Sequence, residues 1–172
     1  MIITNNITSL RNEHCEQIVN LILPIQQIEF NVPITLDGQP DLLDIESKYH
    51  KSGGNFWGSF TNGELTGTIG LIDTGYNTGA IRKMFIKKEF RGKEYGIAQQ
   101  LLDTLLAYCN DHQITKLYLG TVQQLKAAHR FYERNGFERI NKAEMPTFFP
   151  FMQPDDTYYH IHLNNYYNYE CN

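Results

Sequence analysis

A basic, glycine-containing turn at residues 91–98 constrains this chain more than any other feature. The turn reads Arg-Gly-Lys-Glu-Tyr-Gly-Ile-Ala, follows an apolar run at residues 84–86, and opens onto a long amphipathic segment. A strand, a tight turn and a helix in this order leave the first N–H groups of the helix without partners, at the positive end of the helix dipole. Basic side chains lie beside them. We therefore expect a phosphorylated ligand to bind on this turn.

Hydrophobic spacing predicts one α+β domain around the turn. Residues 15–23 and 96–111 carry apolar side chains at helical spacing, and Pro24 is expected to end or kink the first of these helices. Residues 56–61 and 64–72 flank Asn62-Gly63, a strong hairpin signal. The other expected elements are strands at 2–4, 80–86, 115–122, 137–140 and 158–163, helices at 41–49 and 124–134, and loops at 73–79 and 144–156. Because a helix between two strands can form a parallel crossover, we expect a mixed, mainly antiparallel, twisted sheet of about six or seven strands, flanked by about four helices.

Length, charge and cysteine usage limit the class of protein. The 172 residues suit one domain, which we place at residues 1–163, with a C-terminal tail at 164–172. The net charge of -4 argues against a nucleic-acid partner. No apolar run is long enough to span a bilayer, and the N-terminus lacks a secretory pattern. Three widely spaced cysteines fit reduced thiols, so we expect a cytoplasmic protein without a membrane partner.

Two blocks of sequence resemble motifs of the GNAT family of N-acetyltransferases. Residues 84–93, followed by Gly96-Ile97-Ala98, look like the family's acyl-coenzyme A signature. Residues 128–137, which read Ala-His-Arg-Phe-Tyr-Glu-Arg-Asn-Gly-Phe, resemble its downstream helix motif. A helix and a strand separate the two blocks, as the family requires, and the resemblance covers roughly residues 2–163. It implies an acetyl-coenzyme A-dependent N-acetyltransferase, in which a primary amine attacks the thioester directly and no metal takes part.

The resemblance also implies which residues form the site. The expected cofactor-binding residues are Met84, Phe85, Ile86, Arg91, Gly92, Lys93, Gly96, Ile97 and Ala98. The apolar strand would offer backbone groups to the pantetheine arm and the acyl carbonyl, and an N–H there can stabilise an oxyanion. Tyr132 matches the position of the general acid that protonates the coenzyme A thiolate. The alternative for Tyr132 is a core tyrosine with its ring packed on the sheet.

The basic turn departs from the family's usual pattern. That pattern is Arg or Gln, two residues, Gly, one residue, and Gly or Ala, and counting back from Gly96 puts Lys93 at its first position. Either Lys93 replaces the usual basic residue, or Arg91 and Gly92 keep their role and residues 94–95 lengthen the turn. In the downstream motif, Leu125 stands where the family often has Asn.

The acceptor side of the site is less specific. Glu29 and Asp41 lie in the early region that forms the acceptor wall in the resembling family, and each is a candidate for the substrate site or a solvated or capping carboxylate. Arg82 and Lys83 are candidates for orienting an acidic substrate group, or they point to solvent. His129 is expected on a helix surface.

Two classes of function remain open at this point. The first is an acyltransferase whose partner is a small-molecule or peptide amine. The second is a non-catalytic acyl-coenzyme A-binding sensor or structural protein of the same fold. A homodimer is compatible with either, and thiol release in the presence of amines discriminates between them.

Overall fold

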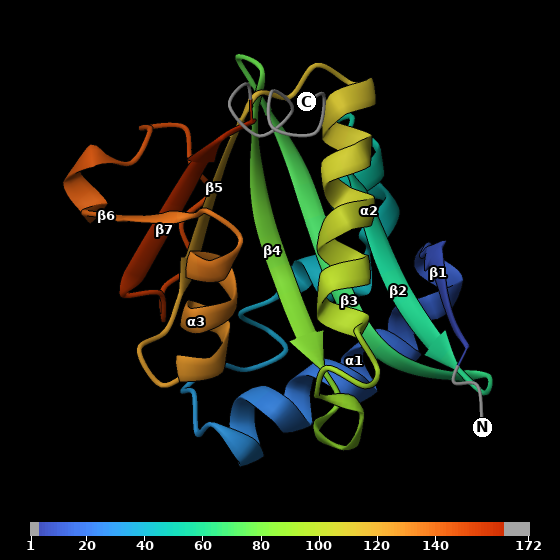
Figure 1. Ribbon diagram of the computed structural model, residues 1–172. Helices are drawn as coiled ribbons and strands as arrows, with labels where there is room; N and C mark the ends of the chain where they lie inside the picture. Colours follow the sequence, from blue (N-terminus) through green and yellow to red (C-terminus); the bar gives the residue numbers. More distant parts are fainter. Residues whose placement is uncertain (1–3, 164–172) are drawn as a thin grey trace.

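The described residues, 4–163, form one seven-stranded mixed sheet in a computed structural model of the chain (Figure 1). The strands are β1 (Asn5–Ser9), β2 (Asn55–Thr61), β3 (Glu64–Gly75), β4 (Thr78–Ile86), β5 (Lys116–Thr121), β6 (Glu138–Ile140) and β7 (Thr157–His162). Their order across the sheet is β1-β2-β3-β4-β5-β7-β6. Only β4 and β5 run parallel, and the helix between them makes the crossover. The predicted fold class, a mixed and mainly antiparallel sheet, is confirmed.

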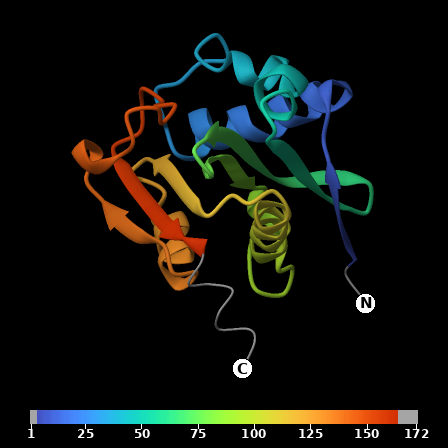
Figure 2. The same ribbon diagram turned by 90° about the horizontal axis from the view of Figure 1, so that it is seen from above.

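Helices cover both faces of the sheet. The α-helices are α1 (Cys15–Pro24), α2 (Ile97–Asp111) and α3 (Lys126–Arg134), and the shorter turns are η1 (Asn12–His14), η2 (Ile25–Glu29), η3 (Pro40–Leu43), η4 (Glu46–His50), η5 (Lys88–Phe90) and η6 (Lys142–Glu144). Figure 2 shows α2 and α3 on one face, and α1 with η2 to η4 on the other. The apolar stripe of α2 is buried as predicted, with Leu101, Leu105 and Cys109 at 0% exposure. In the described part of the chain, no helix combines the length and apolar character that a membrane span needs.

The first helical region begins at Cys15 as predicted but extends beyond its predicted end. The α-helix ends at Pro24, and the chain continues as the π-helical η2 up to Glu29. Helical character therefore extends into a segment that carries Gln26 and Phe30 toward the site described below. The strand predicted at residues 2–4 falls largely outside the described residues, and the first described strand is β1.

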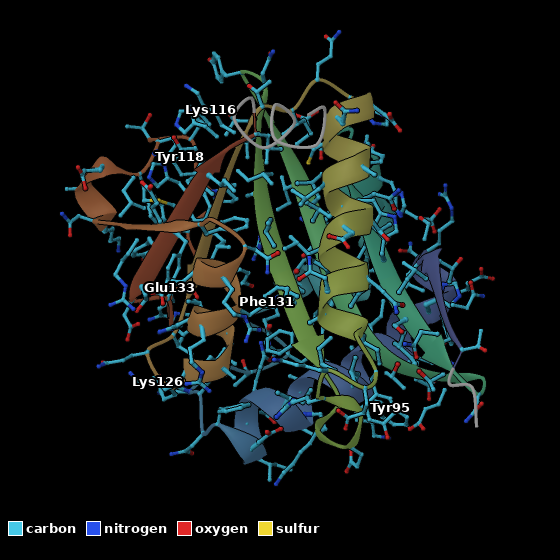
Figure 3. All side chains as sticks on the ribbon, in the orientation of Figure 1. Tyr95, Lys116, Tyr118, Lys126, Phe131 and Glu133 are labelled. Atoms are coloured by element: carbon cyan, nitrogen blue, oxygen red, sulfur yellow. The ribbon has the colours of Figure 1, made fainter. Side chains whose placement is uncertain are left out.

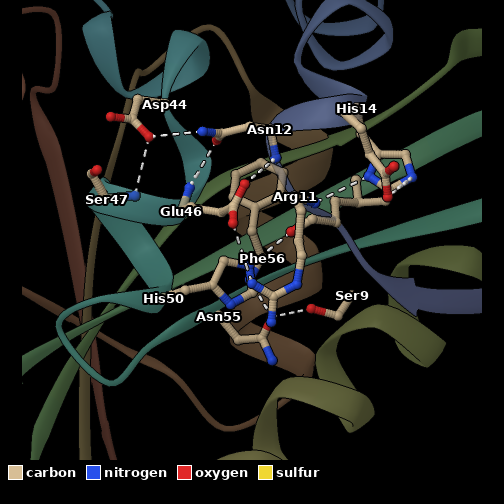
Figure 4. Close-up of polar contacts among 12 residues, drawn as sticks. Ser9, Arg11, Asn12, His14, Asp44, Glu46, Ser47, His50, Asn55 and Phe56 are labelled. Carbon is tan, nitrogen blue, oxygen red and sulfur yellow. Dashed lines mark hydrogen bonds and ion pairs between the residues drawn. The ribbon is translucent and has the colours of Figure 1, made fainter.

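The helix predicted at residues 41–49 is two short pieces, η3 and η4, because Asp44 caps the second of them (Figure 4). The Ser47 backbone N–H donates to Asp44 Oδ1 over 3.2 Å, and Asn12 Nδ2 donates to the same oxygen over 3.1 Å. These bonds, led by that from Asn12, hold the pKa of Asp44 below its usual value. A side chain that bonds backbone two or three residues ahead competes with a continuous helix. The Asn12 amide oxygen accepts from the Glu46 N–H over 3.0 Å, which fastens η1 to η4.

The loop predicted at residues 73–79 is a tight hairpin instead. β3 runs to Gly75 and β4 begins at Thr78, so only Tyr76 and Asn77 form the turn. Their φ angles are 58° and 56°. Two consecutive positive φ values match the twist of paired strands, and asparagine tolerates them better than most residues. The predicted tail, residues 164–172, lies outside the described residues.

Candidate active site

β4 carries a bulge at the level of Lys83 and Met84. The register between β3 and β4 shifts between Thr68 and Gly70, so these two residues of β4 oppose one residue of β3. Lys83 has a φ of 54°, and Thr68 Oγ1 donates a 2.7 Å hydrogen bond to the Lys83 carbonyl oxygen. A bulge redirects side chains and releases main-chain groups from the ladder. It does both here, at the centre of the sheet.

β4 and β5 are paired along only part of their length. The parallel register joins residues 78–81 to residues 116–119, and the described residues show no pairing between these strands beyond Ile81. Figure 1 shows the two strands separating toward α3 and the turn before α2. The main-chain groups of β4 that face β5 beyond Ile81 therefore lack a neighbouring strand. An extended ligand could pair with such an edge as an additional strand does.

The basic turn forms the N-terminal end of α2. Gly96 is the N-cap with a φ of 64°, and Gly92 has a φ of 123°, which are values that favour glycine. The Gly96 N–H donates to the Gly92 carbonyl oxygen over 3.3 Å, which closes the turn. Tyr95 is labelled in Figure 3 at this end of α2. The first turn of α2 contains no acidic residue, so its free N–H groups and dipole are available to an external anion.

Arg91 and Lys93 occupy different positions in this turn. The Arg91 Nε donates to the Ile86 carbonyl oxygen over 2.8 Å, and its Nη2 donates to Glu29 Oε2 over 2.9 Å. Its Nη1 contacts the other carboxylate oxygen of Glu29. The Arg91 guanidinium thus fastens the end of β4 to η2. Lys93 is exposed, and within residues 4–163 its ammonium has no hydrogen-bond or ion-pair partner.

A pocket lies where β4 and β5 diverge. Five segments line it: residues 26–34 after α1, residues 81–85 of β4, residues 120–125 after β5, part of α3, and the loop at 149–155. Both helical layers and the proline-containing loop before β7 therefore meet at one end of the sheet. Concave sites where several elements converge are the usual place for a small-molecule ligand.

Tyr132 of α3 presents its hydroxyl to this pocket. The residue is 5% exposed, its ring packs against Phe137 at a centroid distance of 5.5 Å, and its hydroxyl lies 3.5 Å from Met84 Sδ. Tyr132 thus belongs to the hydrophobic core, as the core-tyrosine alternative expects, and it also lines the pocket. Burial raises the pKa of the Tyr132 phenol, and the charge of Asp155 raises it further. The hydroxyl is therefore neutral and can donate a hydrogen bond.

Lys83 is buried rather than solvent-exposed. Its Nζ donates to Gln39 Oε1 over 2.6 Å and lies 3.7 Å from Asp41 Oδ2. The Tyr49 hydroxyl donates to the same Asp41 oxygen over 2.6 Å. Burial lowers the pKa of Lys83 to about 8, and the positive charge of Arg82 acts in the same direction. Lys83 of the bulge thus lines the pocket, and Asp41 compensates the charge of its ammonium only in part.

Arg82 and Asp155 bring opposite charges to the pocket without a direct ion pair among the described residues. The Arg82 Nε is buried and has no hydrogen-bond partner in residues 4–163, while its Nη2 contacts the weakly accepting sulfur of Met152. Burial raises the pKa of the Asp155 carboxyl to about 6, against the opposing charges of Arg82 and Lys83. A Cβ on Gly120 would lie 2.4 Å from Asp155 Oδ2. The Asp155 carboxylate can therefore occupy this position only because residue 120 has no side chain.

The element order and both motifs agree with a family model for the acetyltransferase (GNAT) family, which matches residues 19–137. The chain belongs to the GNAT family. The match contains β4, the basic turn, α2, β5 and α3, so it includes the bulge, the anion site and Tyr132. The resemblance read from the sequence is confirmed, and so is the GNAT-like fold.

Solved GNAT structures share this fold over almost the whole chain. A GNAT-family acetyltransferase from Staphylococcus aureus Mu50 is 38% identical, with a TM-score of 0.90, and the alignment covers 93% of this chain and 99% of that one. PaiA N-acetyltransferase from Thermoplasma acidophilum, solved with coenzyme A, has a TM-score of 0.72 at 17% identity over 92% of this chain and 99% of that one. The second likeness concerns the fold alone.

A curated relative supports the same family assignment at lower coverage. N-acetylaspartate synthetase of Danio rerio is 33% identical over 106 residues, which are 60% of this chain and 37% of that protein. The chain thus matches little more than a third of this relative's length.

Some of the predicted site residues line the pocket, and others lie outside it. Tyr132, Met84, Phe85, Arg82 and Lys83 all line it. The remaining predicted cofactor residues, Ile86, Arg91, Gly92, Lys93, Gly96, Ile97 and Ala98, follow at the end of β4, in the turn and in the first turn of α2. Glu29 and Asp41, expected in the acceptor wall, do not line the pocket, because each pairs with a basic residue of the β4 region instead.

The sequence did not identify half-buried Asp155 and Gly120 as pocket residues, nor His129 as a buried residue. β7 pairs antiparallel with β5, with Thr157 opposite Thr121. An acidic residue just before the last strand must therefore lie at the end of β5, and this signal could have identified Asp155. His129, expected on a helix surface, is 5% exposed, and its Nε2 lies 3.0 Å from the Val122 carbonyl oxygen.

Proposed function

We propose that the chain is an acetyl-coenzyme A-dependent N-acetyltransferase that acetylates a primary amine. The observation that carries this proposal is that β4, which leads through the basic turn into the N-terminus of α2, has an edge without a neighbouring strand beyond Ile81 and lines one pocket together with Tyr132. These elements suit the parts of the co-substrate. The free N–H groups of α2 suit the pyrophosphate, and the β4 edge suits the amide-containing pantetheine arm.

The residues of the pocket supply the proton transfers. Acetyl-coenzyme A provides the acetyl thioester, whose carbon forms a bond to the amine nitrogen as its bond to sulfur breaks. Asp155 accepts a proton from the substrate ammonium and passes it to solvent. Tyr132 donates its phenolic proton to the departing sulfur, which receives the electron pair, and is reprotonated from water. A backbone N–H at the bulge, beside Met84, stabilises the negative charge on the carbonyl oxygen.

A thiol-release assay with purified protein, acetyl-coenzyme A and a panel of amines tests the proposal. The panel includes polyamines, amino sugars, free amino acids and short peptides, and coenzyme A binding is measured in parallel by calorimetry. We expect binding together with amine-dependent release of thiol. Tight binding without release from any amine would instead favour the acyl-coenzyme A sensor.

The basic turn offers a second, independent test. Lys93 rather than Arg91 supplies the charge for the pyrophosphate, because Glu29 and the Ile86 carbonyl already occupy Arg91. An exposed ion pair such as that of Lys93 with a pyrophosphate contributes up to about 1 kcal/mol, so Lys93→Met should raise the Kd for coenzyme A about fivefold. Lys88→Met, which removes an exposed cation from η5, is the matched control and should leave the Kd unchanged.

Arg91→Met distinguishes the two interpretations of this turn. Its expected main effect is a lower Tm, since it releases the end of β4 from η2. If Arg91→Met abolished coenzyme A binding at unchanged Tm while Lys93→Met had no effect, Arg91 would lead the turn.

A further inference from the structure

We infer that the amine acceptor carries a carboxylate, and that Arg82 binds it. The inference rests on the proposed acetyl transfer and names the acceptor class for the same pocket. Its starting point is an unmatched guanidinium. The Arg82 Nε is buried with no hydrogen-bond partner among the described residues, and one Nη contacts only a thioether sulfur. An unpaired buried donor of a charged group is costly, and a planar acceptor such as a carboxylate satisfies it with two parallel bonds.

The neighbouring acid does not already satisfy Arg82. Asp155 lines the same pocket, yet no ion pair joins it to Arg82 in residues 4–163. Its carboxylate is held against Gly120 of β5, on the opposite side of the gap from β4. A cationic group on β4 and an anionic group of the loop before β7 thus face the same space. A zwitterionic acceptor, with its carboxylate toward Arg82 and its ammonium toward Asp155, matches both charges.

The rest of the charge balance favours an anionic group at the Arg82 side. Lys83 stands next to Arg82 in the bulge, and both side chains line the pocket. The Lys83 ammonium shares Asp41 with Tyr49, so its charge is only partly compensated. Since Asp41 compensates Lys83 only in part and no ion pair among the described residues compensates Arg82, the second ammonium of a polyamine would be repelled by Arg82 or Lys83. A neutral amino sugar would leave the guanidinium unsatisfied.

The pocket wall limits the size of the acceptor. Phe149, Pro150, Met152 and Pro154 of the loop before β7 line the pocket beside Asp155. The loop is fastened at its end, since the Asp156 N–H donates to the Thr121 carbonyl oxygen over 3.0 Å. A free α-amino acid carries its amine and its carboxylate on one carbon, so both charged groups can meet residues that line this one pocket. A long peptide would extend past the loop, so the free amino acid is the form to which we commit.

Calorimetry with N-acetyl amino acids, the products of the proposed reaction, tests the inference without turnover. Each is titrated into the coenzyme A-saturated protein beside its uncharged carboxamide, and an N-acetylated tripeptide that begins with the same residue is a third arm. We expect at least one N-acetyl amino acid to bind roughly 30-fold more tightly than its carboxamide, as charge-assisted hydrogen bonds predict. The tripeptide should bind like the carboxamide. Equal binding of acid and amide would overturn the inference, and tighter binding of the tripeptide would reassign the acceptor to peptides.

Variants of Arg82 complete the test. Arg82→Met should remove the preference for the acid and leave carboxamide binding unchanged, while Arg82→Lys should retain part of it. Arg134→Met, at an exposed position at the end of α3, is the matched control. If Arg82→Met did not fold, the ratio of acid to carboxamide affinity in Arg82→Lys and in the wild type would still test whether Arg82 binds a carboxylate. Thiol release with polyamines but with no amino acid would contradict an acceptor that carries a carboxylate and would still support acetyl transfer. Selective binding of the acids without thiol release from any amine would support the carboxylate site and contradict the proposed acetyl transfer.

Discussion

Replacing Tyr132 by phenylalanine is expected to lower kcat on the order of 100-fold, with little change in the Kd for coenzyme A. The hydroxyl faces the pocket, and its one contact in the described residues is the Met84 sulfur at 3.5 Å, which is a weak acceptor. Removing it therefore costs little folding energy, while the departing thiolate loses its proton donor. Single-turnover thiol release and the Tm of the variant measure the two effects separately.

Tyr159→Phe is the matched control for this substitution. Tyr159 lies beside Tyr132 at a ring distance of 5.9 Å, but its hydroxyl donates to Glu133 and accepts from Arg139, away from the pocket. Its loss should lower the Tm and leave kcat close to wild type. An unchanged kcat in Tyr132→Phe would remove the general-acid assignment, and the ring would then be a core element only.

The sequence predicted the parts of the site that depend on local chain geometry. A glycine turn between an apolar strand and an amphipathic helix constrains its own backbone, so the tight turn at Gly92 and Gly96 and the start of α2 could be predicted from residues 91–98. The core stripe of α2 was readable for the same reason, since helical spacing alone fixes the buried face.

The charged groups of the pocket could not be predicted in the same way. Lys83 and Arg82 were candidates on a strand, but a strand pattern does not show the bulge that begins at Lys83, beside Arg82, where both residues line the pocket. Glu29 was read as part of the acceptor wall because its pairing with Arg91, 62 residues away, is invisible in the chain order. The hairpin at Tyr76 was read as a loop because tyrosine is not a usual residue for a positive φ.

Asp155 is the second residue whose replacement should strongly affect the reaction. Asp155→Asn keeps the shape of the side chain and removes the charge, so we expect kcat/KM to fall on the order of 100-fold. In the wild type, kcat/KM should rise with pH through about 6, as the Asp155 carboxyl ionises and becomes able to accept a proton. The groups that face it are Arg82, Lys83, Lys142 and Asp156. The variant should lose this rise, which a pH–rate profile measures.

The same substitution should stabilise the protein in a pH-dependent way. The pKa of Asp155 is raised by burial to about 6 in the folded protein, against an ordinary value of 3.8. The folded state therefore binds this proton more tightly, so ionisation of Asp155 lowers the free energy of unfolding as pH rises from about 4 to 6. Asp155→Asn removes this cost. Its gain in Tm should be larger at pH 8 than at pH 4.5, and an equal gain at both values would contradict the raised pKa.

Gly120→Ala tests whether the position of the Asp155 carboxylate matters as well as its charge. The added Cβ would lie 2.4 Å from Asp155 Oδ2, so the carboxylate must move away from β5. We expect kcat/KM to fall, and the double variant with Asp155→Asn to be little worse than Asp155→Asn alone, because both changes act on one group. Gly38→Ala is the control, since its Cβ would meet its nearest neighbour at an ordinary 3.5 Å. Additive losses would show that Gly120 acts on the reaction by a route other than Asp155.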